Sequence, residues 1–164
     1  NLNYYNLTKI LFHINSQKIS NQFRSKLIWA RVFFLYGPGE DKSRLVPSLI
    51  NSIKSNKKFQ INDPYKKLNI LHVYDVAKIL YRLLSFTKNS IVHVADNKNY
   101  SIKSKLNKIK KLTNNIHNSK ITLSNKKKNI SNYKVEIKNL KKINYNYHFD
   151  LESGLNDYIN KMKN

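Results

Sequence analysis

A tyrosine and a lysine near the start of the chain have a spacing that suits acid–base chemistry. Tyr5 and Lys9 are four residues apart, and on a helix such residues share one face and can meet at one substrate. A nearby ammonium favours the phenolate over the phenol, which helps a tyrosine to exchange protons near neutral pH. The pair therefore predicts a general acid or base at Tyr5, assisted by Lys9.

The same spacing occurs a second time, at Tyr74 and Lys78. With 11 tyrosines and 27 lysines, the 31 basic residues less four arginines, in a chain of 164, about two such pairs are expected by chance. An isolated pair is ordinarily a partly exposed tyrosine beside a solvated lysine. The elements around each pair must therefore decide whether it has a chemical role.

The first pair lies on a predicted helix that precedes a predicted buried strand. Residues 4–22 have the spacing of an amphipathic helix, and residues 27–35 form the nearly continuous apolar run that is typical of a buried strand in a parallel sheet. That run ends at the turn residues Gly37, Pro38 and Gly39. The apolar positions of the helix are Leu7, Ile10, Leu11 and Ile14.

Further strand-to-helix units are predicted downstream. A helix should begin near Ser43, because Pro47 is tolerated only in a first turn. Residues 68–73 have strand character, and Asp75 can cap a helix after them. The remaining predicted elements are strands over 91–95 and 121–123, a helix capped by Ser101, and helices over 135–143 and 151–162, the last with Asp150 or Glu152 at its positive end.

The segments that follow the first helix have a characteristic order. They read RVFFLYGPGE at 31–40, RLVPSLI at 44–50, LHVYDVA at 71–77, IVHVA at 91–95 and LESGL at 151–155. In order and separation they resemble the NAD-dependent epimerase/dehydratase family of extended short-chain dehydrogenases, which act on nucleotide sugars. The resemblance covers nearly the whole chain and leaves Tyr74 a structural residue within the LHVYDVA segment.

The resemblance implies an α/β fold, namely the C-terminal half of a Rossmann-like parallel-sheet domain plus a small mixed α/β substrate-binding subdomain. Residues 1–36 would hold the catalytic helix and the following strand. Residues 37–164 would be mainly the substrate-binding subdomain, with interleaved Rossmann elements. None of the three glycines of the sequence fits the glycine-rich dinucleotide fingerprint. Since the chain also begins with Asn1, it is expected to be a fragment of a longer enzyme.

By the same resemblance the complete enzyme would be an NAD- or NADP-dependent epimerase or dehydratase, or a reductase. It would act on a nucleotide sugar through a keto intermediate. Tyr5 would be the catalytic acid or base, Lys9 would hold the nicotinamide ribose, and both would contact the cofactor. Phe33 would offer a main-chain contact to the nicotinamide in addition to packing in the core. The substrate-binding residues would be Phe34, Arg44 and Leu45, with Arg44 either pairing with a diphosphate or lying at the surface without a ligand.

Several positions depart from the family pattern. Phe34 stands where many members have an asparagine, and Leu68 stands where many have a diphosphate-binding arginine, for which Lys66 or Lys67 is a candidate substitute. In the next segment His93, Ala95 and Asp96 replace asparagine, glycine and serine. His72 is expected to be a structural strand-end residue. The sequence therefore leaves open which nucleotide sugar is used and which of the three reactions follows.

The composition raises an alternative function. The net charge of +22 and the isoelectric point near 10.1 favour binding to nucleic acid, and the sharpest lysine cluster is residues 126–128. Only four of the basic residues are arginines, however, and arginine is preferred for recognition of bases and phosphates. We therefore expect a solvated basic surface and no nucleic-acid partner. A lysine-rich nucleic-acid-binding module and a non-catalytic remnant of the same fold are the alternatives.

Cysteine is absent, which excludes disulfides, thiolate catalysis and cysteine-ligated zinc and agrees with a cytoplasmic location. No apolar run approaches the roughly 20 residues that a membrane span requires. We expect no metal site and no membrane partner. A homodimer of the parent enzyme is a further expectation.

Overall fold

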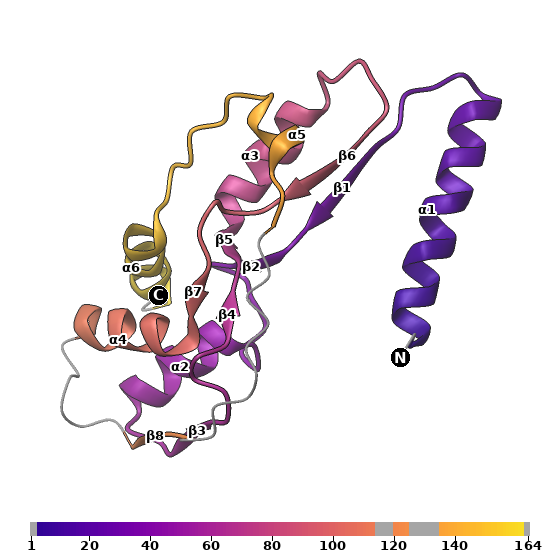
Figure 1. Cartoon of the computed structure of the whole chain (residues 1–164). Coiled ribbons are helices and arrows are strands. Elements are labelled where there is room, and N and C mark those ends of the chain that lie inside the picture. The colour runs from indigo at the N-terminus through magenta and orange to yellow at the C-terminus, as the bar shows by residue number, and fades with distance from the viewer. Residues whose placement is uncertain (1–2, 114–119, 125–134, 163–164) are drawn as a thin grey trace.

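The computed structural model describes residues 3–113, 120–124 and 135–162 (Figure 1). Its helices are α1 (Tyr4–Gln22), α2 (Leu45–Lys54), α3 (Val73–Leu83), α4 (Ile102–Leu112), α5 (Lys138–Lys141) and α6 (Leu151–Lys161). Its strands are β1 (Ile28–Val32), β2 (Phe34–Tyr36), β3 (Phe59–Ile61), β4 (Lys67–Leu68), β5 (Ile70–His72), β6 (Ser90–Val94), β7 (Tyr100–Ser101) and β8 (Ile121–Leu123).

The strands pair two by two in the described part of the chain. β1 lies parallel to β6, β2 to β5 and β3 to β8, whereas β4 runs antiparallel to β7. Parallel neighbours that are joined through helices are typical of α/β folds. The predicted α/β class is therefore confirmed.

The apolar run 27–35 forms two strands, so the prediction of one continuous buried strand was wrong. The chain leaves β1 at Phe33 and continues in β2, and the two strands pair with different partners, β6 and β5. Val32, Phe34 and Leu35 stay 38%, 52% and 43% exposed. Each of the two strands also has a neighbour on one edge only among the described residues.

Two hydrophobic cores hold the elements together. One core packs α3 against β1 and β6, and Ile79 and Val92 are its fully buried members. The other core lies where α2, α4 and α6 meet, with Leu49, Ile109 and Leu155 completely buried. The first core draws on elements from both sides of residue 36, as expected for interleaved Rossmann elements. The domain boundary at that residue stays a prediction.

Local capping explains where several helices begin. α2 begins at Leu45, two residues after the predicted start, which leaves Pro47 in the first turn as predicted. Ser101 caps α4 as predicted. At the start of α6 the Asp150 carboxylate accepts the Ser153 N–H at 2.8 Å, and the Ser153 hydroxyl oxygen accepts the Asp150 N–H. Such a capping box satisfies two main-chain donors at once.

Three further local predictions were wrong. The stretch 68–73 is not one strand, because it is divided between β4, β5 and the first residue of α3. The cap of α3 is His72, whose ring nitrogen accepts a main-chain N–H of the first turn, while Asp75 lies inside the helix and is fully buried. Residues 135–143 form only the four-residue α5. Side-chain bonds tie this segment to β6, and Asn139 Nδ2 donates to the Ile91 carbonyl at 2.8 Å. These contacts hold the segment in a path that a long helix would not follow.

α1 has the predicted bounds and lies apart from the other helices (Figure 1), and its apolar positions are not buried. The four apolar positions predicted to be buried are 42% to 50% exposed. The helix contacts the sheet through His13, whose ring stacks on Trp29 at 4.4 Å between centroids. An apolar helix face of this length ordinarily packs against another element.

Candidate active site

α1 presents Tyr5 and Lys9 on one face near its N-terminus. The helix is capped by Asn3, whose side chain accepts the Asn6 N–H at 2.9 Å. Lys9 Nζ lies 5.5 Å from the centre of the Tyr5 ring. The Tyr5 side chain is 68% exposed, and its hydroxyl makes no hydrogen bond to any residue that the structure describes. The phenol is therefore free to meet a ligand, with an ammonium beside its ring.

Two cavities adjoin Tyr5. One, the helix groove, lies between α1 and β1, has a volume of about 940 Å³ and includes Lys9 and Val32 in its lining. The other, the strand-end cavity, has a volume of about 760 Å³ and lies where β1 and β2 run into the turn before α2. Tyr5 lines both cavities. Both volumes fall in the range of small-molecule sites.

The structure brings the predicted site residues together around these cavities. Lys9 lines the helix groove. The strand-end cavity is lined by Tyr5, Phe33, Phe34, Arg44 and Leu45. Residues from the first helix, the strand ends and the start of α2 therefore converge on one region, although they are up to 40 positions apart in sequence.

The main chain at Phe33 is held by the sheet. Its N–H donates to the Val94 carbonyl at 3.2 Å, and its ring meets the His93 ring edge-on at 5.9 Å between centroids. The N–H is therefore committed to β6. A contact from this group to a ligand would require the bond to Val94 to open.

Two acidic residues that the sequence reasoning did not select also line the strand-end cavity. They are Glu40 and Asp41, beside Arg44. Burial raises the pKa of the Glu40 carboxyl, against the opposing effects of the Gly37 N–H and Arg44. Hydrogen bonds from the Ser43 hydroxyl and N–H, at 2.6 and 2.7 Å, lower the pKa of Asp41. Their place directly after a strand was a usable signal, since ligands in α/β folds bind at the carboxyl ends of strands.

The wall of the strand-end cavity is apolar at the position of Leu68, where the family often has an arginine. Leu68 is buried and lines the strand-end cavity, whereas Lys66 and Lys67 do not line it. Arg44 is thus the only cation that lines this cavity among the described residues. The lysine cluster at 126–128 lies outside the described residues.

The second tyrosine–lysine pair has nearly the same internal geometry in different surroundings. Lys78 Nζ lies 5.4 Å from the centre of the Tyr74 ring, but this ring packs beside the rings of His148 and Phe149. Neither Tyr74 nor Lys78 lines the two cavities. Position in the fold distinguishes the two pairs, because their spacing and separation do not.

His72 has the surroundings of a structural residue. It is 3% exposed, its Nε2 lies 3.3 Å from Asp157 Oδ2 on α6, and its ring meets Tyr36 edge-on. Burial lowers the pKa of His72, and the charges of Asp157 and Asp75 partly oppose that effect. Because His72 lines neither cavity, its contacts join the end of β5 to α6, which supports the predicted structural role.

Groups of side chains suited to holding a metal ion are absent from the described residues. Within the same part of the chain, no helix has the length and apolar character needed to cross a membrane.

Comparison with protein families supplies the decisive observation. The NAD dependent epimerase/dehydratase family matches residues 1–102, more than half of the chain. The chain belongs to this family. The match includes all the cavity-lining residues discussed above, from Tyr5 to Ile70. No curated protein sequence matches the chain.

Solved structures with the same fold include several family enzymes. A UDP-N-acetylglucosamine 4-epimerase from Methanobrevibacter ruminantium superposes with a TM-score of 0.84 at 19% identity, covering 97% of this chain and 53% of its own. A dTDP-glucose 4,6-dehydratase from Bacillus anthracis, complexed with NAD, gives 0.83 at 16%, covering 99% and 52%. RMD from Pseudomonas aeruginosa, complexed with NADPH, gives 0.85 at 16%, covering 98% and 56%. The chain therefore spans about half the length of these proteins.

Proposed function

We propose that this chain supplies the catalytic tyrosine and the substrate-binding side of an NAD- or NADP-dependent enzyme that epimerises or dehydrates a nucleotide sugar. The observation that carries the proposal is the position of Tyr5, whose side chain lies between the helix groove and the strand-end cavity. A proton-transferring group at that junction can reach ligands in both cavities.

In this proposal the strand-end cavity holds the nucleotide sugar. Arg44, the only cation in its lining among the described residues, pairs with the diphosphate. Phe34 and Leu45 supply apolar walls, and Phe34 cannot donate the side-chain hydrogen bond that an asparagine offers at that position. The affinity for the diphosphate then depends on Arg44 more strongly than in members that also have an arginine at the position of Leu68.

The helix groove has residues that fit the nicotinamide end of a dinucleotide. The Lys9 ammonium lies in its lining and can donate to both hydroxyls of a ribose. The bound dinucleotide supplies hydride acceptance and return. No glycine-rich turn for the pyrophosphate is present in this sequence, so we propose that polypeptide outside this chain holds that part of the cofactor.

The chemical role of this chain is the movement of one proton. Tyr5 accepts the proton of a sugar hydroxyl while the carbon beneath it is oxidised to the keto level, and it returns the proton when the ketone is reduced. The positive charge of Lys9 beside the ring stabilises the deprotonated form of Tyr5, which is the form that accepts the proton in the first half. The same effect makes the protonated Tyr5 a stronger acid, so it favours return of the proton to the product in the second half. Epimerisation, dehydration and reduction differ only in what happens to the keto sugar.

The test is turnover by the protein that carries this chain. UDP-, dTDP- and GDP-linked hexoses are incubated with NAD or NADP, and the products are identified by proton NMR. We expect one nucleotide class to be converted, and we expect Arg44→Ala to raise KM for it at least tenfold. Lys42→Ala removes a nearby exposed cation outside the cavity and should leave KM unchanged. Absence of turnover with every pair of sugar and cofactor would leave only the non-catalytic remnant.

A further inference from the structure

The side chains that line the strand-end cavity offer few partners for a sugar. Among the described residues, four side chains of the lining are polar, namely those of Tyr5, Glu40, Asp41 and Arg44, and the other eight are apolar. Polar groups of a ligand that lose water in such a cavity need hydrogen-bonding or ionic partners. The chemistry of these four side chains therefore restricts which sugar the cavity can hold.

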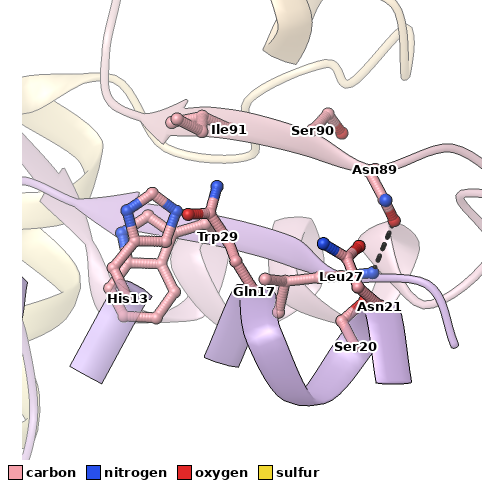
Figure 2. A pocket seen from close by; sticks show the side chains of 9 residues that line it. All are labelled: His13, Gln17, Ser20, Asn21, Leu27, Trp29, Asn89, Ser90 and Ile91. Carbon is pink, nitrogen blue, oxygen red and sulfur yellow. Dashed lines mark hydrogen bonds between the residues drawn. The ribbon is translucent and has the colours of Figure 1, made fainter. Parts of the chain in front are cut away.

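Carboxylates line only one of the three cavities beside α1. The cavity at the other half of the helix has no lysine, arginine, aspartate or glutamate among its described lining residues (Figure 2). The helix groove has two cations, Lys9 and Arg31, and no carboxylate in the same part of the chain. The strand-end cavity has Glu40 and Asp41 against Arg44 alone. Negative charge is therefore concentrated where we place the nucleotide sugar, and positive charge where we place the cofactor.

Neither carboxylate forms an ion pair with a described residue. The Ser43 hydroxyl and N–H both donate to Asp41 Oδ1 and lower the pKa of Asp41, so this group is ionised at neutral pH. Oε2 of Glu40 is shielded from solvent and accepts no hydrogen bond from a described residue. Burial raises the pKa of Glu40, but neither of its protonation states supplies a positive charge. The sugar thus meets one fixed negative charge and a second carboxyl group.

Arg44 is committed to the diphosphate in the proposed function. The two phosphates carry two negative charges, which a single guanidinium neutralises only in part. A carboxylate on the sugar would add a third negative charge, near Asp41 and without a cation of its own in the described lining. A sugar hydroxyl at the same place instead donates a hydrogen bond to an ionised carboxylate, which only accepts such bonds.

We infer that Glu40 and Asp41 determine the sugar specificity of the strand-end cavity, by selecting nucleotide-linked hexoses, which have no carboxylate, and rejecting hexuronates. The inference rests on the proposed function, because it takes this cavity to be the nucleotide-sugar site. It adds the chemical class of the sugar and the residues that select it. A hexose and its hexuronate on the same nucleotide differ only at C6, so comparing them isolates the effect of the carboxylate.

Isothermal titration calorimetry on the protein that carries this chain measures this preference. The ligands are three matched pairs: UDP-glucose with UDP-glucuronate, dTDP-glucose with dTDP-glucuronate, and GDP-mannose with GDP-mannuronate. We expect at least one hexose to bind, with a dissociation constant at least tenfold below that of its hexuronate. Glu40→Gln and Asp41→Asn keep the size of each side chain and remove its charge. Together they should narrow this ratio at least threefold, mainly through tighter binding of the hexuronate.

The matched control is Glu136→Gln. Glu136 is an exposed carboxylate that lines neither the helix groove nor the strand-end cavity, so the variant should keep the ratio of the parent. An unchanged ratio in the double variant, or an equal change in Glu136→Gln, would contradict the assignment to Glu40 and Asp41. The ratio in the parent tests the inference on its own, whether or not the double variant folds.

A hexuronate that binds as tightly as its hexose would overturn the inference, and so would binding of neither member of any pair. The result can be told apart from that of the proposed function. Turnover of a hexuronate with the same kcat/KM as its hexose would refute this inference and leave the proposed function intact. A tenfold preference for the hexose in binding, without any turnover, would support this inference and count against the proposed function.

Discussion

Gly154 in α6 packs against the end of the YGPG strand, and this contact predicts a measurable coupling. A Cβ atom at position 154 would overlap the Tyr36 hydroxyl, and it would lie 3.1 Å from the ring carbon that bears that hydroxyl and 3.3 Å from Phe149 Cβ. Alanine inside a helix is otherwise favoured over glycine by about 1 kcal/mol. Overpacking in a tight core costs about 1 to 3 kcal/mol, and here the hydroxyl is attached to a buried ring that cannot swing away.

We therefore expect Gly154→Ala to destabilise the protein by up to about 2 kcal/mol, after its helix propensity is subtracted. Tyr36→Phe removes the overlapping oxygen and leaves the ring contact at 3.1 Å, which needs a shift of only a few tenths of an ångström. The double variant should thus recover most of the loss, with a coupling energy of about 1 kcal/mol or more. Urea unfolding of the four proteins, followed by circular dichroism, measures it. Additive effects of the two substitutions would refute the packing argument.

Two further predictions concern buried charged groups. Asp75 accepts hydrogen bonds from the Tyr145 hydroxyl and the His148 N–H at 2.6 and 2.8 Å. Asp75→Asn should therefore lower the unfolding free energy by about 2 to 4 kcal/mol. The control Asp41→Asn, at an exposed position, should change the unfolding free energy little. Burial lowers the pKa of Lys105 from 10.5 to about 8, so the unfolded chain binds more protons between these values and stability rises with pH across that window, by up to about 3 kcal/mol. Chemical denaturation at pH 7 to 10 should show this rise missing in Lys105→Met. The rise of stability with pH should remain in a control variant that replaces an exposed lysine of α4. An equal dependence of stability on pH in the parent, Lys105→Met and the control would contradict the assignment of the effect to Lys105.

The sequence predicted those parts of the fold that neighbouring residues determine. The bounds of α1 follow from its spacing, and the starts of α4 and α6 follow from the capping side chains Ser101 and Asp150. The predicted cap of α3 was wrong because two residues near its start can serve as a cap. The position was taken by His72, while Asp75 became a buried anchor for the segment at 145–149.

Features that depend on partners distant in sequence were not predicted. The break at Phe33 arises because β1 and β2 pair with strands that occur far later in the chain, and an apolar run alone does not reveal this. The path of residues 135–143 depends on side-chain bonds to β6. That Glu40 and Asp41 line the same cavity as Arg44 was seen only in the structure, although their place after a strand was a usable signal.

The predicted site residues came from the order of the motifs, and their spacing alone would not have selected them. The two tyrosine–lysine pairs have separations of 5.5 and 5.4 Å between ammonium and ring centre. Only the pair on α1 lies at cavities that also contain strand-end residues. This difference provides a matched control for the central claim.

The most direct test is the turnover of Tyr5→Phe compared with that of Tyr74→Phe in the protein that carries this chain. Both substitutions remove one phenolic oxygen and keep the ring, and both tyrosines have a lysine four residues later. Removing a positioned general acid or base commonly costs 10² to 10⁴ in rate, so we expect kcat to fall by about that factor for Tyr5→Phe, with cofactor binding retained. Tyr74→Phe should keep nearly full activity. Near-full turnover by Tyr5→Phe, or equal losses for the two variants, would contradict the assignment of the active site to α1.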